Sequence, residues 1–246
     1  METYYWLALG VFLVAGTIKG AIGIGLPTTV ISTLSQFEDP RIAITLGVLP
    51  MVTSNLWQFY SEGRMVETIR RYWPFAATMA VSLFLASLFV VGVPAAAMMM
   101  VTGGAIALFA ATSLIKSPPK LNPAYDTQVQ VGGGLTAGVL GGFTGLWSPP
   151  LVIYLLSRRL ERDDYVRTFG FLLLVGALPL LGGYVSNGLM TDEMFLLSLL
   201  MCAPTFAGFW LGAKIRRRMD TTRYQKAVLV FFLLMGLNLV RKAWLG

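Results

Sequence analysis

The sequence predicts an all-α polytopic membrane protein with two inverted-topology repeats. Each repeat is a re-entrant-like helical hairpin, broken by glycine and proline, followed by three transmembrane helices. Of the 246 residues, 56% are hydrophobic and only 13% are charged, which is too apolar for the half-polar surface of a soluble domain. Long stretches contain almost no ionisable residue, and one glycine and proline pattern recurs half a chain apart. These observations place most of the chain in lipid.

The crossing helices are predicted from apolar segments close to the length that a bilayer requires. About 20 apolar residues span the hydrocarbon core. Lys226, near the start of the last segment, can extend its ammonium group to the interface. The predicted helices are 42–59, 73–91 and 95–115 in the first half, and 166–186, 194–213 and 224–240 in the second.

The repeat is carried by glycines and prolines at matching positions. A GxxxG run by itself is typical of two helices that pack closely. Recurrence of the whole pattern with its proline favours a special turn in each half. The matching positions are Gly16, Gly20, Gly23 and Pro27 in the first copy, and Gly138, Gly142, Gly145 and Pro149 in the second, each 122 residues further on.

Each copy predicts a hairpin, at 4–37 and 128–157, because glycine-rich sequence followed by proline interrupts a helix. The breaks are expected at 19–26 and 141–148. In the first hairpin the arms 4–18 and 27–37 contain 15 and 11 residues. At a rise of about 1.5 Å per residue, neither comfortably crosses a hydrocarbon core of about 30 Å. Re-entrant arms are therefore expected, with full spans as the alternative.

The predicted organisation is a first repeat at 1–116, a polar linker at 117–127 and a second repeat at 128–246. A hairpin that enters and leaves on one face does not change sides, whereas three crossing helices do. The second copy therefore starts on the opposite face from the first. This inverted arrangement is common in secondary transporters.

The net charge of +7 is explained by loop positions, so nucleic acid is not an expected partner. Most of the 19 Lys and Arg residues lie in the loops 60–72, 116–128, 158–167 and 214–223. The opposite loops, 37–41, 92–94 and 187–193, contain Arg41 as their only basic residue. The positive-inside rule places the basic loops in the cytoplasm and the N-terminus outside. No basic region precedes the first apolar stretch, so a cleaved signal is not expected.

The broken helices predict a place for a negative charge. Backbone groups freed by a break cannot face lipid, and the first amides of a helix, with its dipole, favour anions. We expect an anion at the opposed turns near the midplane, exposed to each side in turn by rocking of the halves. The candidate substrate-binding residues are Lys19, Gly20, Gly23, Pro27, Thr28, Thr29, Asn55, Gly142, Gly145, Trp147, Ser148 and Pro149.

Two polar candidates have alternative interpretations. Lys19 lies in the first glycine stretch, where a buried cation would be functional, but a shallow arm would let it reach water. Asn55 could complete the site together with Gln58, or both could hold helices together.

Catalysis and metal binding are not expected, and neither is a cofactor. The chain has no histidine and a single cysteine, Cys202, and its apolar segments contain no acidic residue. Neither a nucleophile with its base nor a membrane carboxylate relay is therefore present. With the cell interior negative, an anion that leaves gains about 2.3 kcal/mol per charge at 100 mV, so export needs no coupling ion.

The glycine-rich start, the proline-led second arm in both halves and the short basic loops resemble the TauE/SafE family of sulfite exporters, from about Leu7 to Val240. The resemblance implies a multi-pass protein of the bacterial inner membrane that moves sulfite or an organosulfonate. It also implies that Gly20, Gly23, Pro27, Gly142, Gly145 and Pro149 line the conduit. Trp147 and Pro150 depart from the glycine-rich pattern and would alter the size of the pocket.

The expected function is outward transport of a small anion, with the lipid bilayer as its environment. The alternatives are an importer of an organosulfur compound or another small organic anion, and a non-transporting membrane scaffold. An oligomer is possible, but no sequence pattern indicates one.

Overall fold

A computed structural model of the chain describes residues 2–61, 65–115, 118–216 and 221–245, which are helical over nearly their whole length and contain no strand. Parts of the basic loops 60–72, 116–128 and 214–223, and of the predicted linker, lie outside these residues. The helices are α1 (Glu2–Ile22), α2 (Leu26–Leu34), α3 (Pro40–Ser61), α4 (Met65–Leu88), η1 (Val90–Gly92), α5 (Ala95–Ile115), η2 (Pro123–Tyr125), α6 (Asp126–Thr144), α7 (Ser148–Ser157), α8 (Arg162–Ser186), α9 (Asp192–Arg216) and α10 (Thr221–Leu245).

Six of the described helices are long and apolar enough to cross a membrane, by length and composition. In lipid, a helix satisfies its own backbone hydrogen bonds, which is why apolar sequence of this length becomes helix. α4 is equally long, but its first two turns carry Glu67, Arg70 and Arg71. The six are Tyr4–Ile22, Pro40–Tyr60, Ala95–Ile115, Asp164–Ser186, Asp192–Ile215 and Gln225–Leu245. The predicted all-α membrane fold is confirmed.

The chain forms two compact units, and each combines elements from both halves of the sequence. Unit 1 comprises Met1–Pro50, Val93–Ile115 and Met190–Gly246. Unit 2 comprises Met51–Gly92 and Lys116–Leu189, so α3 contributes to both units. The predicted repeats are therefore not the packing units, and their inverted orientation stays a prediction.

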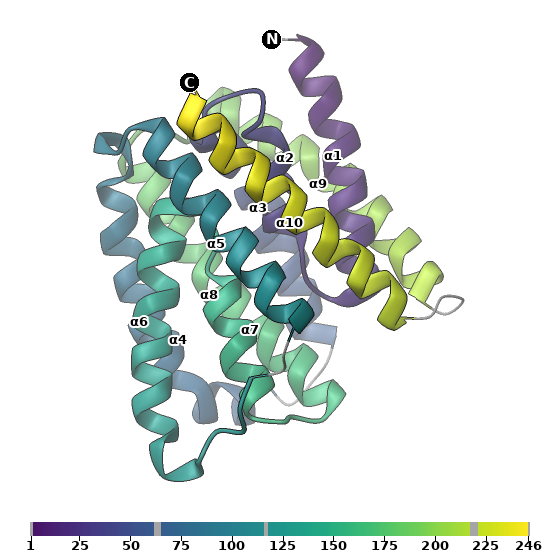
Figure 1. Cartoon of the computed structure of the whole chain (residues 1–246). Helices are drawn as coiled ribbons and strands as arrows, with labels where there is room; N and C mark the ends of the chain where they lie inside the picture. Colours follow the sequence, from purple (N-terminus) through teal and green to yellow (C-terminus); the bar gives the residue numbers. More distant parts are fainter. Residues whose placement is uncertain (1, 62–64, 116–117, 217–220, 246) are drawn as a thin grey trace. The chain divides into compact units, whose positions relative to one another are not determined.

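In unit 1, α1 lies along α9, while α5 packs against α10 (Figure 1). Small residues allow the first pair to approach closely. A Cβ atom added to Gly16 or Gly20 of α1 would lie well under 3.0 Å from a backbone oxygen of α9, and one added to Gly208 or Gly212 of α9 would meet α1 in the same way. These glycines are the contact surface of a tight helix crossing.

In unit 2, glycines also allow two helices to pack closely, but the helices are different ones. There α6 lies along α4, and α8 packs against the same helix (Figure 1). A Cβ atom on Gly138 would come within 2.5 Å of the Met79 carbonyl oxygen, and one on Gly142 within 2.6 Å of the Leu83 carbonyl oxygen. In each unit, the helix before a glycine turn therefore packs on the third long helix of the other sequence half.

The predicted length of the first arm is wrong. α1 has 21 residues instead of 15, so at about 1.5 Å per residue it is about 31 Å long and can cross the bilayer. Gly16 and Gly20 remain helical because their missing side chains let α9 approach, and this packing offsets the weak helix propensity of glycine. α2 has only nine residues and is too short to cross alone. Similarly, α4 ends at Leu88, before the predicted end at 91.

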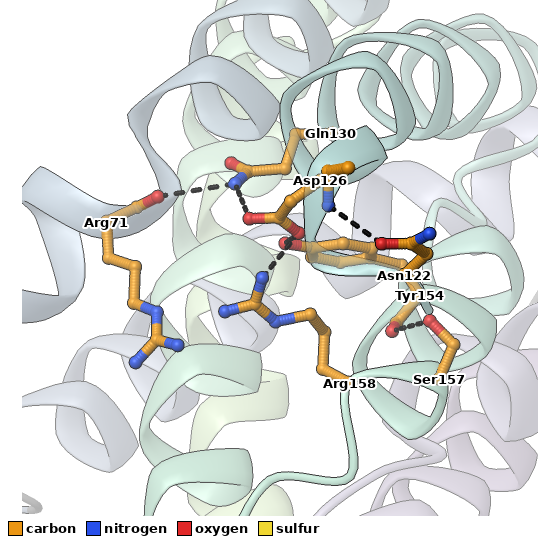
Figure 2. Close-up of polar contacts among 8 residues, drawn as sticks. Arg71, Asn122, Asp126, Gln130, Tyr154, Ser157 and Arg158 are labelled. Carbon is orange, nitrogen blue, oxygen red and sulfur yellow. Dashed lines mark hydrogen bonds and ion pairs between the residues drawn. The ribbon is translucent and has the colours of Figure 1, made fainter. Parts of the chain in front are cut away.

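A polar cluster at one end of unit 2 joins the linker to α4 and α7 (Figure 2). Asp126 is its centre. Its carboxylate accepts hydrogen bonds from Gln130 Nε2 at 3.0 Å and from the Tyr154 hydroxyl at 3.1 Å, and it forms an ion pair with Arg158. Gln130 also donates to the Arg71 carbonyl of α4. One carboxylate thus holds the start of α6 beside the end of α7.

We predict that Asp126→Asn lowers the stability of the protein. The amide keeps an acceptor for Tyr154 or Gln130 but leaves Arg158, a mostly buried cation, without its charged partner. The expected cost is about 1–2 kcal/mol. Thermal unfolding in detergent would measure this as a lower midpoint. Glu67→Gln, the same charge change on an exposed side chain of α4, is the control. Equal midpoints for the two variants would contradict the assignment.

Candidate functional site

The first helix break lies in unit 1, within the predicted range. α1 ends at Ile22 and α2 begins at Leu26. Gly23 and Gly25 have φ values of 83° and 106°, in the left-handed region that glycine enters without a Cβ clash. The Gly23 amide donates to the Lys19 carbonyl at 2.7 Å, which ends α1 with a left-handed cap. Pro27 then lies in the first turn of α2, where its missing N–H costs nothing.

The second break lies in unit 2 and has the same local chemistry. α6 ends at Thr144, and Gly145 has a φ of 70°. Its amide donates to the Gly141 carbonyl at 2.8 Å, the counterpart of the Gly23 to Lys19 bond. α7 then begins at Ser148 with Pro149 in its first turn. The sequence repeat is therefore a repeat of local backbone structure.

At the start of α2, two buried threonines have different roles. Both donors of Thr29 are engaged by the Gly25 carbonyl, the hydroxyl at 2.8 Å and the amide at 2.9 Å. Thr28 is also buried, and its hydroxyl forms no side-chain hydrogen bond within the described residues. Of the two hydroxyl donors expected from the sequence, only that of Thr28 is available to an anion.

At the start of α7, prolines reduce the number of donors. Pro149 and Pro150 have no N–H, and the Leu146 amide donates to the Thr144 hydroxyl at 3.2 Å. The donors left at this turn in the described chain are the amides of Trp147 and Ser148, the buried Ser148 hydroxyl and the buried indole N–H of Trp147. A helix N-terminus of this kind carries partial positive charge and favours an anion.

Comparison with family models matches the chain to the sulfite exporter TauE/SafE family over residues 8–239. The chain belongs to this family. Comparison with curated proteins and with solved structures gives no match. The resemblance seen in the glycine and proline pattern is thereby confirmed. The TauE/SafE family implies a multi-pass membrane transporter of the sulfite or anion exporter type, with a small anion as its substrate.

Within this TauE/SafE protein, the predicted site residues divide between the two units. The sequence did not single out Gly25, although its φ of 106° makes it as necessary to the first turn as Gly23. The run GIGLP, with a glycine directly before the proline-led helix, was the available signal. Unit 1 holds Lys19, Gly20, Gly23, Pro27, Thr28 and Thr29 around one turn; unit 2 holds Gly142, Gly145, Trp147, Ser148 and Pro149 around the other, with Asn55 in its part of α3.

Lys19 lies in the last turn of α1, with only 2% of its surface exposed. The alternative in which its side chain reaches water is therefore not the arrangement found. A Cβ atom added to Gly20, the next residue, would clash with the Phe209 backbone of α9. The close packing of α1 on α9 thus holds Lys19 in the protein interior, one turn before the break.

Asn55 is buried on α3, in the part that belongs to unit 2. Its neighbour one turn on, Gln58, donates a hydrogen bond from Nε2 to the Val166 carbonyl of α8 at 3.2 Å. This bond gives Gln58 the role of holding two helices together, which the sequence left open. For Asn55 the role in the transporter is still a proposal.

Trp147 fills the second turn. Its side chain is 0% exposed and packs against Gly141 and Gly176, where a Cβ atom would lie 2.8 Å from the tryptophan Cβ and 2.5 Å from the indole nitrogen. The corresponding residue in the first copy is Gly25, which has no side chain. The two turns of this TauE/SafE protein are therefore similar in backbone but different in volume.

Proposed function

We propose that the protein exports sulfite or an organosulfonate outward across the bacterial inner membrane. The amide ends of α2 and α7 are its proposed anion-binding elements. The observation that carries the proposal is the same feature in two places: a left-handed glycine, a buried hydroxyl at Thr28 or Ser148, and a proline-led helix start. Membership of a sulfite exporter family supports the sulfur oxyanion as substrate.

The charge distribution around the turns supports an anion over a cation. Each helix start presents unpaired amides and the positive end of a helix dipole. Lys19 adds a buried cationic side chain one turn before the first break. The apolar segments contain no acidic residue that would repel the substrate or attract a cation. A small oxyanion with several acceptor atoms matches these donors.

The proposed direction rests on loop charge and on electrical driving force. The basic loops mark the cytoplasmic face, which places the N-terminus outside. With the interior negative, outward movement of one negative charge gains about 2.3 kcal/mol per 100 mV. Import would need a coupling ion. Vesicles with an imposed potential distinguish the two directions: flux that rises as the anion-containing side becomes negative supports export, and flux that requires an ion gradient supports import.

We predict that Thr28→Val combined with Ser148→Ala strongly reduces transport. Each change removes one hydroxyl while keeping a similar volume, and the loss of two donors to a charged ligand is expected to lower affinity at least about tenfold. The assay is flux of labelled sulfite in proteoliposomes.

The control for this assay is Thr136→Val with Ser186→Ala. Both side chains are exposed and lie away from the turns, and among the described residues each hydroxyl bonds only to the carbonyl four residues back in its own helix. Wild-type flux in the control together with wild-type flux in the Thr28/Ser148 variant would reject the proposed binding elements. Loss of ligand-dependent thermal stabilisation should accompany the loss of flux.

A further inference from the structure

A second cationic site lies in unit 1, away from the glycine turns. A cavity of about 550 Å³ opens between the C-terminal end of α2 and the last turns of α10. Its lining has a polar part, here called the polar wall, and an apolar part, here called the apolar wall. The polar wall contains Gln36, Asn238, Arg241 and Lys242, and the apolar wall contains Phe37, Met235 and Leu245. No carboxylate lines it among the described residues. The cavity is therefore suited to a ligand with a negatively charged part and an apolar part.

The polar wall is built by a chain of hydrogen bonds. Lys242 Nζ donates to the Gln36 carbonyl at 2.7 Å and so satisfies a carbonyl just beyond the end of α2. Asn238 donates from Nδ2 to Gln36 Oε1 at 2.8 Å, and its own Oδ1 accepts from Arg241 Nε at 3.0 Å. The Lys242 ammonium group is thus hydrogen-bonded to the backbone, and Asn238 orients the guanidinium group of Arg241.

This arrangement leaves donors available in the cavity. Of the Arg241 guanidinium, only Nε has a partner within the described residues, so both terminal nitrogens can form the two-pronged contact that Arg makes with oxyanions. Thr33 also lines the cavity, and its buried hydroxyl has no partner in the described part of the chain. A bidentate guanidinium and a hydroxyl in the same cavity are a suitable combination for a phosphate group.

The apolar wall indicates where the rest of the ligand lies. Phe37 and Leu245 line the cavity and are 59% and 71% exposed. Leu245 ends α10, whose candidate membrane span is Gln225–Leu245, so the cavity lies where the span meets the interface. Exposed apolar side chains beside an available guanidinium at that level match a lipid, whose acyl chain and charged head meet there. A free phosphate ion would leave the apolar wall uncovered.

We propose that this cavity binds the phosphate group of an anionic membrane phospholipid, with Arg241 as the main ligand. Thr33 adds a second hydrogen bond, and Phe37 and Leu245 contact the lipid's apolar part. The transported substrate plays no part in this site, so the proposal is independent of the proposed function.

The test measures thermal stability of the full chain, purified in neutral detergent, as each ligand is titrated. The ligands are phosphatidylglycerol, phosphatidylcholine and inorganic phosphate. Phosphatidylglycerol should raise the unfolding midpoint, since a ligand bound only by the folded form stabilises it. In Arg241→Gln the half-saturating concentration should rise about tenfold or more. Arg70→Gln, the same change on an exposed arginine of α4, should keep the wild-type response.

Three results would overturn the proposal. Equal stabilisation by phosphatidylcholine and phosphatidylglycerol would mean that negative charge is not recognised. An unchanged titration in Arg241→Gln would place the binding elsewhere. Inorganic phosphate that reproduces the whole midpoint shift would make the cavity a site for a free oxyanion and exclude the lipid as its occupant. Because Arg241 is exposed, its variant should fold, so each result can be measured.

Discussion

Replacing Gly20 by alanine should lower the unfolding temperature of the protein sharply. The new Cβ would lie well under 3.0 Å from the Phe209 carbonyl oxygen of α9, and the nearest atoms are all backbone, which cannot move aside as a side-chain end can. Overpacking costs about 1–3 kcal/mol where neighbours adjust, and a backbone contact at this crossing should reach or exceed the upper value. Thermal unfolding in detergent measures the loss.

The control is on the same helix. Within the described residues, Gly10 of α1 has no atom within 4 Å of an added Cβ, so Gly10→Ala should gain up to about 1 kcal/mol from helix propensity. The second unit offers a parallel comparison, in which Gly142→Ala clashes with α4, whereas Gly132→Ala on the same helix meets no atom of the described part of the chain within 4 Å. Similar midpoints for Gly20→Ala and Gly10→Ala would show that α1 and α9 do not pack as described.

Replacing Trp147 by alanine should have the next largest effect. The indole is completely buried between Gly141 and Gly176, and both glycines leave room for it. Truncating a fully buried tryptophan costs about 3–5 kcal/mol through lost contacts and the cavity left behind. Trp147→Phe keeps a ring in the space and should lose much less. Unfolding midpoints for the two variants would give this order.

An exposed tryptophan provides the control for this series. Trp73 of α4, in the same unit, is 61% exposed, and Trp73→Ala should change stability by about 1 kcal/mol or less. If Trp147→Ala matched Trp73→Ala, the indole would not be a packing element of the turn. Sulfite flux measured on the same Trp147 variants would then show whether the volume of this side chain affects transport, separately from its effect on stability.

Much of the fold follows from the sequence because lipid imposes a simple rule. Apolar segments in a bilayer must be helices, so composition and segment length predict an all-α membrane protein, and the match over residues 8–239 agrees with the resemblance seen in the glycine pattern. The breaks at Gly23 and Gly145 were also predictable, since each glycine is followed four residues later by a proline, Pro27 or Pro149, which does not continue a helix from before it.

The donors at each turn were predictable only in part. Sequence places Thr28 and Thr29 together at a helix start, but which hydroxyl is available depends on the hydrogen bonds of the turn. Thr29 donates back to the Gly25 carbonyl, whereas Thr28 does not. The cavity at Arg241 was not predicted at all, because its lining residues come from the C-terminal end of α2 and from α10, which lie about 200 residues apart in the chain.

The sequence alone determined that this chain is a membrane protein of two similar halves, each interrupted once by glycine and proline. The tertiary structure decided what each glycine does. Gly23 and Gly145 turn the chain, whereas Gly20 and Gly142 stay helical and receive the backbone of a helix from the other half of the sequence. The physical reason is that a missing Cβ permits both outcomes, and only the presence of a closely packed neighbour selects between them.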